Sequence, residues 1–309
     1  EDAIVYGAPM SHGVGLYAIP HLMAGARHVV PASGGVDPAE LFALGRALGP
    51  LSTFAAPTIV KRLVDHAERE GLTREDAARS FKTIVYGGAP MYVADIQRAL
   101  AVMGPRFVQI YGQGETPMVA TALARQHLVD AAHPRHLERL ASVGVAQTPV
   151  RVRVADAAGR ECAVGEIGEV LVRGDTVMAG YWRNPEATAA AIRDGWLWTG
   201  DVGSLDADGF LTLMDRSKDL LISGGSNIYP REVEEVLLSA PRAWPRRRWS
   251  VHPTPNGARW WWPSSWRSRA CRPMPPRSTP TACSTSRASS GPSAMCSSTR
   301  CRRTTTARC

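Results

Sequence analysis

The chain has 309 residues, 44% of them hydrophobic, and a formal net charge of +8. This length and apolar content allow a sizeable core and as many as two domains. No run of about 18 or more apolar residues occurs, so we expect no membrane-spanning helix. A positive charge of this size is typical of nucleic-acid binding, but it is not spread evenly along the chain.

Composition changes near residue 240. From Pro241 onward the chain has 14 Arg and no Lys, Asp or Glu. The first 240 residues therefore hold 22 basic and 28 acidic residues, a net charge of −6, and we expect no nucleic-acid partner for them. The tail, residues 241–309, also holds six of the nine Trp but no Leu, Ile, Phe or Tyr. A segment without these side chains cannot build an ordinary core, so we expect a disordered tail.

Cysteine usage follows the same division. Only Cys162 lies in the first 240 residues, which predicts a reducing environment and hence a cytoplasmic location. The chain opens at Glu1 and Asp2, with neither an initiating Met nor a charged and then apolar leader. We therefore expect it to begin inside a longer protein.

Strand and helix signals alternate in the first part of the chain. Helices are expected over residues 37–48, 57–70 and 93–103, and strands over residues 81–86 and 106–111. Asp37 is a good N-cap for the first helix and Pro38 fits its first turn, while glycines follow both strands. This order is typical of an α/β fold with a mostly parallel sheet, which binds ligands at the carboxyl ends of its strands.

Strand signals dominate the following part. Strands are expected over residues 150–154, 167–173 and 209–214, and a helix over residues 185–193. A last helix is expected over residues 230–238, because Pro230 fits a first helical position and carboxylates follow it near the N-terminus. The chain shows no internal repeat.

A glycine-rich segment follows the expected strand 106–111 and has the sequence Tyr111-Gly112-Gln113-Gly114-Glu115-Thr116. Gly112 and Gly114 allow the backbone to approach a ligand closely. Glu115 is a hard oxygen ligand that suits Mg²⁺ beside phosphates. Taken alone, this segment indicates no more than a turn, and the glycine-rich segment 86–90 is equally ambiguous.

A longer set of motifs follows. Residues 198–203 have the sequence Trp-Thr-Gly-Asp-Val-Gly, and residues 206–210 are Asp-Ala-Asp-Gly-Phe. Residues 215–234 begin Asp-Arg-Ser-Lys-Asp and end Tyr-Pro-Arg-Glu-Val-Glu. From about residue 11 to residue 238 this ordered set resembles the adenylate-forming superfamily of acyl-CoA synthetases, peptide-synthetase adenylation domains and luciferases. The stretch 177–188, with Val-Met-Ala-Gly-Tyr-Trp and Asn-Pro-Glu-Ala-Thr, is similar to the acyl-CoA synthetases in particular.

The resemblance implies a large N-terminal domain with mostly parallel sheets and a β-rich subdomain, followed by a small α+β C-terminal domain. It assigns residues 1–215 to part of the first domain and residues 216–240 to the hinge and the start of the second. An AMP-forming acyl-CoA synthetase joins a carboxylic acid to ATP as an acyl-adenylate and then transfers the acyl group to CoA. The implied cofactors are therefore ATP, Mg²⁺ and CoA, and the implied substrate is a fatty or aromatic acid.

The resemblance also implies nucleotide-binding residues. An ionised Asp201 would accept hydrogen bonds from both ribose hydroxyls, and Arg216 would add planar donors to ribose or phosphate. The Tyr111 ring would stack on the adenine. The residues implied for the adenine slot are Gly87, Gly88, Ala89, Pro90, Tyr111, Gly112 and Gln113.

Catalytic residues are implied in the same way. Glu115 would hold Mg²⁺, and His12 matches a residue of the acyl pocket near the carboxylate. Lys218 matches the hinge position, where a few backbone torsions would absorb the domain rotation between the two steps. Without the resemblance, His12 indicates a packed or surface histidine and Lys218 a solvated surface lysine. The residues implied for CoA binding are Ser223, Gly224 and Gly225.

The sequence departs from the family in three places. Gly114 stands where the family has Thr in Tyr-Gly-x-Thr-Glu, and Thr116 lies two positions away. The Ser/Thr/Gly-rich phosphate loop expected before His12 is absent, as is the final Pro-Lys-x-x-x-Gly-Lys motif. We therefore expect that the chain as written does not form an acyl-adenylate.

A frameshift would explain the tail. Residues 301–309 can be encoded so that a frame starting one nucleotide earlier gives Leu-Pro-Lys-Asn-Asn-Tyr-Gly-Lys-Val, which contains the missing motif. The same shift turns residues 288–300 into a typical lead-in and the Trp run 260–262 into valines of a buried strand. We infer a frameshift near residues 239–243, by sequencing error or mutation, after which the Arg, Trp and Cys residues have no designed role.

Three alternatives to an acyl-CoA synthetase stay open. An adenylation domain that loads a carrier protein would be favoured by a carrier domain downstream. A nucleic-acid binder using the Arg- and Trp-rich tail would be favoured by salt-dependent RNA binding that truncation at residue 240 removes. The third alternative is an inactive gene fragment.

Overall fold

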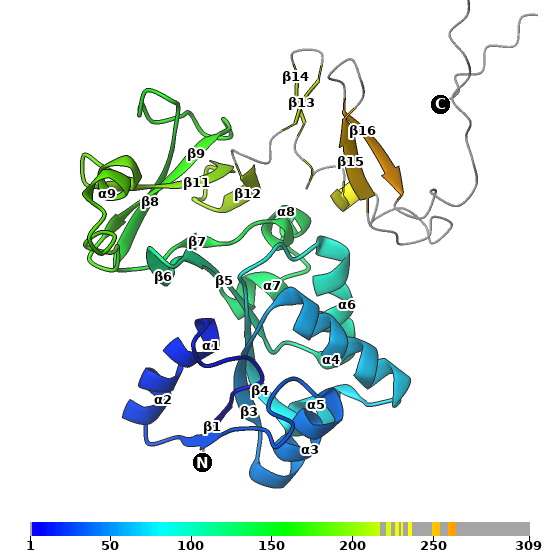
Figure 1. Cartoon of the computed structure of the whole chain (residues 1–309). Helices are drawn as coiled ribbons and strands as arrows, with labels where there is room; N and C mark the ends of the chain where they lie inside the picture. Colours follow the sequence, from blue (N-terminus) through cyan, green and yellow to red (C-terminus); the bar gives the residue numbers. More distant parts are fainter. Residues whose placement is uncertain are drawn as a thin grey trace, which may run out of the picture. The chain divides into compact units, whose positions relative to one another are not determined.

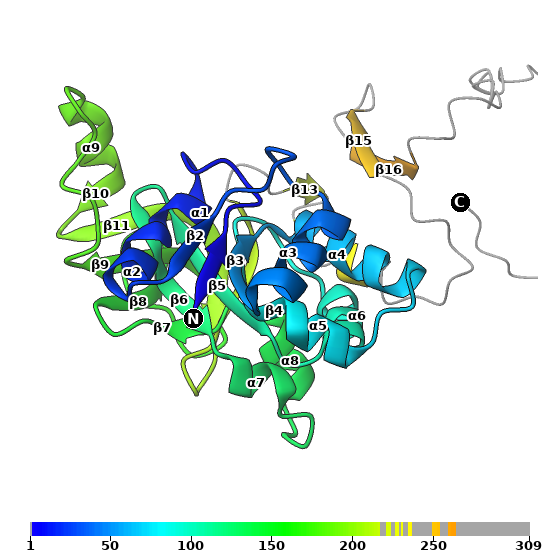
Figure 2. The same cartoon turned by 90° about the horizontal axis from the view of Figure 1, so that it is seen from below.

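The computed structural model describes residues 2–216, 221–223, 226–228, 230, 234–236, 249–253 and 259–263. Figure 1 shows a cartoon of the chain coloured from the N-terminus to the C-terminus, and Figure 2 shows the same cartoon turned by 90°. The two larger sheets of the described part have seven and five strands. Among the described residues, no helix has the length and apolar character needed to cross a membrane.

The first sheet has seven strands in the order β2-β1-β3-β4-β5-β6-β7. Its strands are β1 (Ala3–Val5), β2 (Arg27–Val29), β3 (Leu51–Ala55), β4 (Phe81–Tyr86), β5 (Phe107–Gln113), β6 (Thr116–Leu123) and β7 (Val145–Ala146). Strands β2, β1, β3, β4 and β5 pair in parallel, which confirms the predicted α/β fold with a mostly parallel sheet. Strands β6 and β7 are antiparallel. Strand β6 follows β5 through a tight turn that returns the chain directly alongside it, whereas a parallel strand needs a crossover.

Helices lie on both faces of this sheet. Figures 1 and 2 show α3 to α6 on one face and α1 and α2 on the other. The helices are α1 (Gly13–Leu16), α2 (Ala18–Met23), α3 (Pro38–Leu48), α4 (Pro57–Arg69), α5 (Arg74–Ser80), α6 (Val93–Met103), α7 (Arg125–Val129) and α8 (His136–Ala141). The predicted Asp37 cap is present, since its side chain accepts a hydrogen bond from the Ala39 amide at 2.9 Å. The predicted helices 37–48, 57–70 and 93–103 are confirmed as α3, α4 and α6.

The second sheet is antiparallel and matches the predicted β-rich subdomain. It has the order β10-β11-β9-β8, with β12 paired to β11. Its elements are β8 (Val150–Ala155), β9 (Gly168–Gly174), helix α9 (Pro185–Ala191), β10 (Ile192–Arg193), β11 (Trp196–Leu205) and β12 (Leu211–Arg216). The prediction of a helix over residues 185–193 was two residues too long. Asp194 and Gly195 both have positive φ, which suits a two-residue hairpin turn and forces residues 192–193 into a strand.

Beside a small cluster of Ile4, Tyr6 and Val14 at α1, two larger apolar clusters fix these layers. The larger one lies between the parallel sheet and α3 to α6, where Phe42 meets Phe81 edge to face at a centroid distance of 5.1 Å. The smaller one contains Tyr111 from the first sheet and Leu211 from the second. Backbone hydrogen bonds from the Val143 amide to the Leu211 carbonyl (2.7 Å) and from the Leu211 amide to the Gly144 carbonyl (2.8 Å) join the two sheets beside this cluster.

The described segments after residue 216 are short. Strands β13 (Leu221–Ser223) and β14 (Ser226–Ile228) form one antiparallel pair, and β15 (Trp249–Pro253) and β16 (Arg259–Pro263) form another. Residues 230 and 234–236 are helical, in agreement with the predicted helix 230–238, whose other residues lie outside the described part. Strands β15 and β16 lie within the tail that the sequence predicts to be disordered, and aromatic and β-branched residues in them favour strand pairing. The prediction of disorder stays untested. The rest of the tail lies outside the described residues.

Candidate functional site

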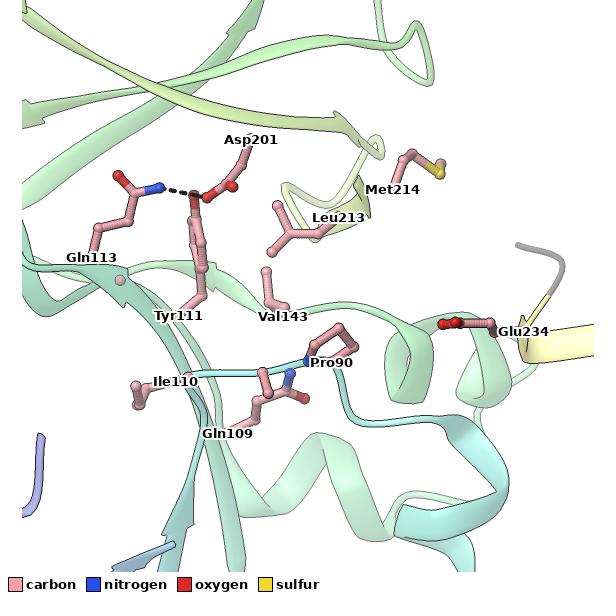
Figure 3. Close-up of a pocket in the computed structure, with 13 residues that line it drawn as sticks. Pro90, Gln109, Ile110, Tyr111, Gln113, Val143, Asp201, Leu213, Met214 and Glu234 are labelled. Atoms are coloured by element: carbon pink, nitrogen blue, oxygen red, sulfur yellow. Dashed lines mark hydrogen bonds between the residues drawn. The ribbon is translucent and has the colours of Figure 1, made fainter. Parts of the chain in front are cut away.

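A cavity of about 390 Å³ lies at the carboxyl end of β5, where the second sheet approaches the first. This is the edge at which a mostly parallel sheet is expected to bind ligands. Figure 3 shows its walls, which come from β5, the loop after β4, β11 and β12. The lining residues are Gly88, Ala89, Pro90, Gln109, Ile110, Tyr111, Gly112, Gln113, Val143, Asp201, Leu213, Met214 and Glu234.

Asp201 is the buried carboxylate of this cavity and is only 8% exposed. Its Oδ2 accepts a hydrogen bond from the Tyr111 hydroxyl at 2.7 Å and another from Gln113 Nε2 at 2.6 Å. Gln113 Nε2 also donates to the Thr199 carbonyl at 2.9 Å, and Figure 3 shows Gln113 and Tyr111 directed at Asp201. Three residues implied by the family resemblance therefore meet at one point. Two donors on one oxygen hold the carboxylate in a fixed orientation.

The irregular part of β11 that carries Asp201 is itself held by hydrogen bonds. Thr199 Oγ1 donates to the Val170 carbonyl at 2.7 Å and accepts from the Asp201 amide at 3.1 Å. The Gly200 amide donates to Glu169 Oε1 at 2.9 Å. Asp201 also lies opposite Arg216 in the register of β11 and β12. The backbone at the predicted Arg216 therefore lies beside Asp201, although its side chain is outside the described part.

The glycine-rich loop after β4 forms a second wall. Gly88, Ala89 and Pro90 are exposed and line the cavity, and their assignment to the adenine slot stays a prediction. Gly87 is buried and does not line it. A Cβ at Gly87 would lie 2.5 Å from the Ile110 carbonyl oxygen, so glycine is required there for the close approach of the loop to β5.

Glu115 lies in the turn between β5 and β6 and is half-buried. Its Oε1 accepts a hydrogen bond from the Tyr181 hydroxyl at 2.6 Å, and this hydrogen bond raises the pKa of Tyr181 above its ordinary value. Within the described residues, no group of three or more His, Cys, Asp or Glu side chains could hold a metal ion. A single carboxylate fits Mg²⁺ only when substrate phosphates and water supply the other ligands, which is the usual arrangement for that ion.

His12 is not one of the cavity residues. It is exposed at the N-terminus of α1, and its Nδ1 lies 3.2 Å from Ser11 Oγ. The next residue packs tightly against β6, since a Cβ at Gly13 would lie 1.9 Å from Met118 Cε. The acyl-pocket role of His12 therefore stays a prediction.

The remaining predicted residues lie mostly outside the described part. Lys218, Gly224 and Gly225 are outside it. The backbone of Ser223 is described, as the residue paired with Ser226 in β13 and β14. The hinge and CoA-binding predictions therefore stay untested.

Several cavity residues were missed by the sequence. Gln109 lies two positions before Tyr111 on β5, and strand alternation could have placed it on the same face. Leu213 and Met214 fall in the predicted strand 209–214, but nothing in the sequence directs them to a cavity. Val143 comes from the loop after α8, and its position depends on the tertiary contact with Leu211.

The AMP-binding enzyme family model matches residues 1–182. The chain belongs to this family. A medium/long-chain-fatty-acid–CoA ligase of Mycobacterium tuberculosis is 35% identical over 233 residues, which are 75% of this chain and 38% of the relative. A fatty acid–[acyl-carrier-protein] ligase of Streptomyces coeruleorubidus is 34% identical over 241 residues, 78% of this chain and 44% of the relative.

A solved structure gives the same result for the fold. The O-succinylbenzoate coenzyme A synthetase of Bacillus subtilis, in complex with AMP, superposes with a TM-score of 0.66 and 29% identity. The match covers 82% of this chain and 48% of that one. The chain thus spans less than half the length of the three proteins just described, and the predicted resemblance to AMP-forming acyl-CoA synthetases is confirmed.

Proposed function

We propose that the intact protein ligates a carboxylic acid to CoA through an acyl-adenylate, and that the cavity beside Asp201 holds the AMP portion. The observation that carries this proposal is the pair of hydrogen bonds from Tyr111 and Gln113 to Asp201. They orient the buried carboxylate of Asp201 beside the end of β5, where it can accept hydrogen bonds from the ribose hydroxyls. An ionised carboxylate has acceptor positions on both oxygens, which suits it to hydroxyl donors such as those of a ribose.

The shape of the cavity supports a nucleotide. The exposed loop residues Gly88, Ala89 and Pro90 form one wall, and Leu213 and Met214 from β12 supply apolar surface. Tyr111 presents its ring to the same space and its hydroxyl to Asp201. An apolar slot with one fixed carboxylate at its end suits an adenine base joined to a ribose. Arg216 is proposed to add donors to the ribose or the phosphate.

The proposed reaction has two balanced steps. A carboxylate oxygen of the acid attacks the α-phosphorus of ATP, a new P–O bond forms, and the bond to the β-phosphate breaks to release pyrophosphate. The CoA thiolate then attacks the acyl carbonyl carbon and AMP leaves. Glu115 would hold Mg²⁺, which offsets the charge on the phosphates. Lys218 would lie at the hinge between the steps, His12 near the acid, and Ser223, Gly224 and Gly225 along the CoA path.

The proposed acid is a fatty or an aromatic carboxylic acid. The relatives are named for a medium- or long-chain fatty acid, and the solved structure is named for succinylbenzoate. A screen of the intact, in-frame protein with acids of both kinds would separate them. Because the cavity described above is assigned to the nucleotide, it does not distinguish between these acids.

Loading of a carrier protein is the second candidate function. It is supported by the 34% identity to the fatty acid–[acyl-carrier-protein] ligase over 241 residues. The adenylation step is the same, and only the thiol that accepts the acyl group differs. Comparing transfer to CoA with transfer to a phosphopantetheinylated carrier protein, again in the intact protein, would decide between the two.

Nucleotide binding by this chain tests the proposed site. In isothermal titration calorimetry, AMP should bind, and 2′,3′-dideoxy-AMP should bind roughly tenfold or more weakly, because hydrogen bonds to a charged group contribute about 1.5–3 kcal/mol. CMP is the control for the base. Equal affinity for AMP and the dideoxy analogue would contradict the assignment of Asp201 to the ribose.

A further inference from the structure

Glu115 is held in place by a segment that lies more than sixty residues further along the chain. Its carbonyl oxygen accepts a hydrogen bond from the Met178 amide at 2.8 Å. Its Oε1 accepts from the Tyr181 hydroxyl at 2.6 Å, across 66 residues of sequence. The segment that contains Met178 and Tyr181 therefore fixes both the backbone and the carboxylate of Glu115.

Tyr181 is itself braced by the first turn of α9. Its amide donates to Thr188 Oγ1 at 2.9 Å, and Thr188 Oγ1 in turn donates to the Asn184 carbonyl at 2.8 Å. Gly180 has a φ of +146°, and a Cβ there would lie 2.7 Å from Thr188 Cγ2. The backbone of Tyr181 is thus tied to a helix by contacts that are independent of Glu115. These contacts hold the backbone of Tyr181 in place without any contribution from Glu115.

The chemistry of the two groups fixes the direction of the hydrogen bond. The Tyr181 hydroxyl donates it, because a carboxylate oxygen accepts. Glu115 is the acceptor. Within the described residues, its second oxygen, Oε2, accepts no hydrogen bond. One oxygen of this carboxylate is therefore held by the phenol, and among the described residues no donor occupies the other.

We propose that Tyr181 is a positioning residue for Glu115: by holding Oε1, it presents Oε2 to the divalent cation that accompanies ATP. This proposal rests on the proposed function, since the cation is expected only together with the nucleotide phosphates. An exposed hydrogen bond of this kind contributes little to folding, and 39% of Tyr181 is exposed. Partners that orient a metal-binding carboxylate are worth about 10- to 100-fold in metal affinity.

The test measures binding rather than turnover. ATP and AMP are titrated into the 309-residue chain by calorimetry, in EDTA and in saturating Mg²⁺. For Tyr181→Phe, the gain in ATP affinity on adding Mg²⁺ should shrink about tenfold, while AMP affinity in EDTA stays at the wild-type value. If the hydroxyl is responsible, Tyr181→Ala should reduce the Mg²⁺-dependent gain in ATP affinity no more than Tyr181→Phe does.

Matched variants separate positioning from folding. Trp182→Phe changes the adjacent, 87% exposed aromatic residue and should keep the full Mg²⁺ gain. Glu115→Gln should remove the gain, and adding Tyr181→Phe to it should cause no further loss, because both act through one interaction. A merely structural role for Tyr181 would instead lower AMP affinity in EDTA as well.

Each outcome bears on the proposal. If the wild-type chain binds AMP but the Mg²⁺ gain is unchanged in Tyr181→Phe, the positioning role is wrong and the nucleotide site stands. The same holds if the wild-type chain shows no Mg²⁺ gain. If the wild-type chain binds no AMP, the proposed function fails and this inference fails with it.

Discussion

The hydroxyl of Tyr111, near the end of β5, donates a hydrogen bond to Oδ2 of Asp201 in β11 at 2.7 Å, although 90 residues separate them. Both residues are 8% exposed. This contact links the parallel sheet to the antiparallel one at the wall of the cavity. It therefore contributes both to the packing of the two sheets and to the orientation of the carboxylate proposed to bind ribose.

Tyr111→Phe removes this hydroxyl and leaves the ring. A hydrogen bond to a charged group contributes about 1.5–3 kcal/mol, so the free energy of unfolding should fall by about 1.5 kcal/mol in denaturant titrations. AMP affinity should also fall. Tyr6→Phe is the matched control, because its buried hydroxyl lies 2.6 Å from His28 Nδ1 and away from the cavity. That variant should lose stability without losing AMP affinity, and identical AMP affinities for both variants would contradict the role of Tyr111.

A larger side chain should lower the stability of the chain at Gly112 but leave it nearly unchanged at Gly114. A Cβ at Gly112 would lie 2.7 Å from the Thr116 carbonyl oxygen and 2.8 Å from the Met118 amide, whereas a Cβ at Gly114 would meet nothing within 4 Å. Gly112→Ala should therefore destabilise the chain by about 1–3 kcal/mol. Gly114→Thr, which restores the residue usual in the family, should change stability by less than about 0.5 kcal/mol. Comparable losses for the two variants in denaturant titrations would show that the turn is built differently.

Gly114→Thr also has a functional consequence. The family places a hydroxyl at this position, so the variant should bind ATP more tightly than the wild-type chain while binding AMP equally well. Calorimetry with both nucleotides measures this difference. Gly114→Ala is the control for the added Cβ alone and should leave ATP affinity unchanged.

Acid should weaken the fold through His127. Burial, and then the positive charge of Arg139, lower the pKa of His127 below 6.5, and its ring packs edge to face on Phe210 at 5.2 Å. Because the unfolded chain binds this proton more readily, the stability contributed at neutral pH is lost as pH falls from about 6.5 towards the lower folded pKa. His127→Gln should reduce the loss of stability between about pH 6.5 and the lower folded pKa. Urea titrations at about pH 7.5 and about pH 5.5 measure it, and an unchanged slope in the variant would rule the residue out.

The local signals in the sequence were sufficient for the long helices. Asp37 and Pro38 mark the start of α3, and Pro57 marks the start of α4. Strands β1 and β2 have three residues each, too few for an alternating pattern to emerge. Their pairing depends on the sheet around them, so sequence periodicity could not identify them.

The site divides in the same way. Tyr111, Gln113 and Asp201 could be assigned from motifs, because each stands in a segment that the family resemblance identifies. The contact between Glu115 and Tyr181 could not, because it depends on the position of α9 relative to the turn after β5. Neither residue contains a signal for the other, although both lie in motifs that were recognised separately.

The frameshift near residues 239–243 is tested by the DNA. The codons of residues 301–309 should permit Leu-Pro-Lys-Asn-Asn-Tyr-Gly-Lys-Val in the frame that starts one nucleotide earlier. Codons of Arg, Thr or Ala that are incompatible with this second frame would end the hypothesis. The pairing of β15 with β16 does not test the frameshift, because forming a strand pair does not reveal the reading frame of the gene.

The most direct measurement of the central claim is the affinity of AMP for wild-type and Asp201→Asn chains, determined by calorimetry at equal protein concentration. The substitution keeps the size of the side chain but removes its charge and replaces one acceptor with a donor. AMP should bind the wild-type chain and bind Asp201→Asn about 10- to 100-fold more weakly, with circular dichroism showing the same fold. Equal affinity in the two chains, or no binding of AMP to the wild-type chain, would contradict the account.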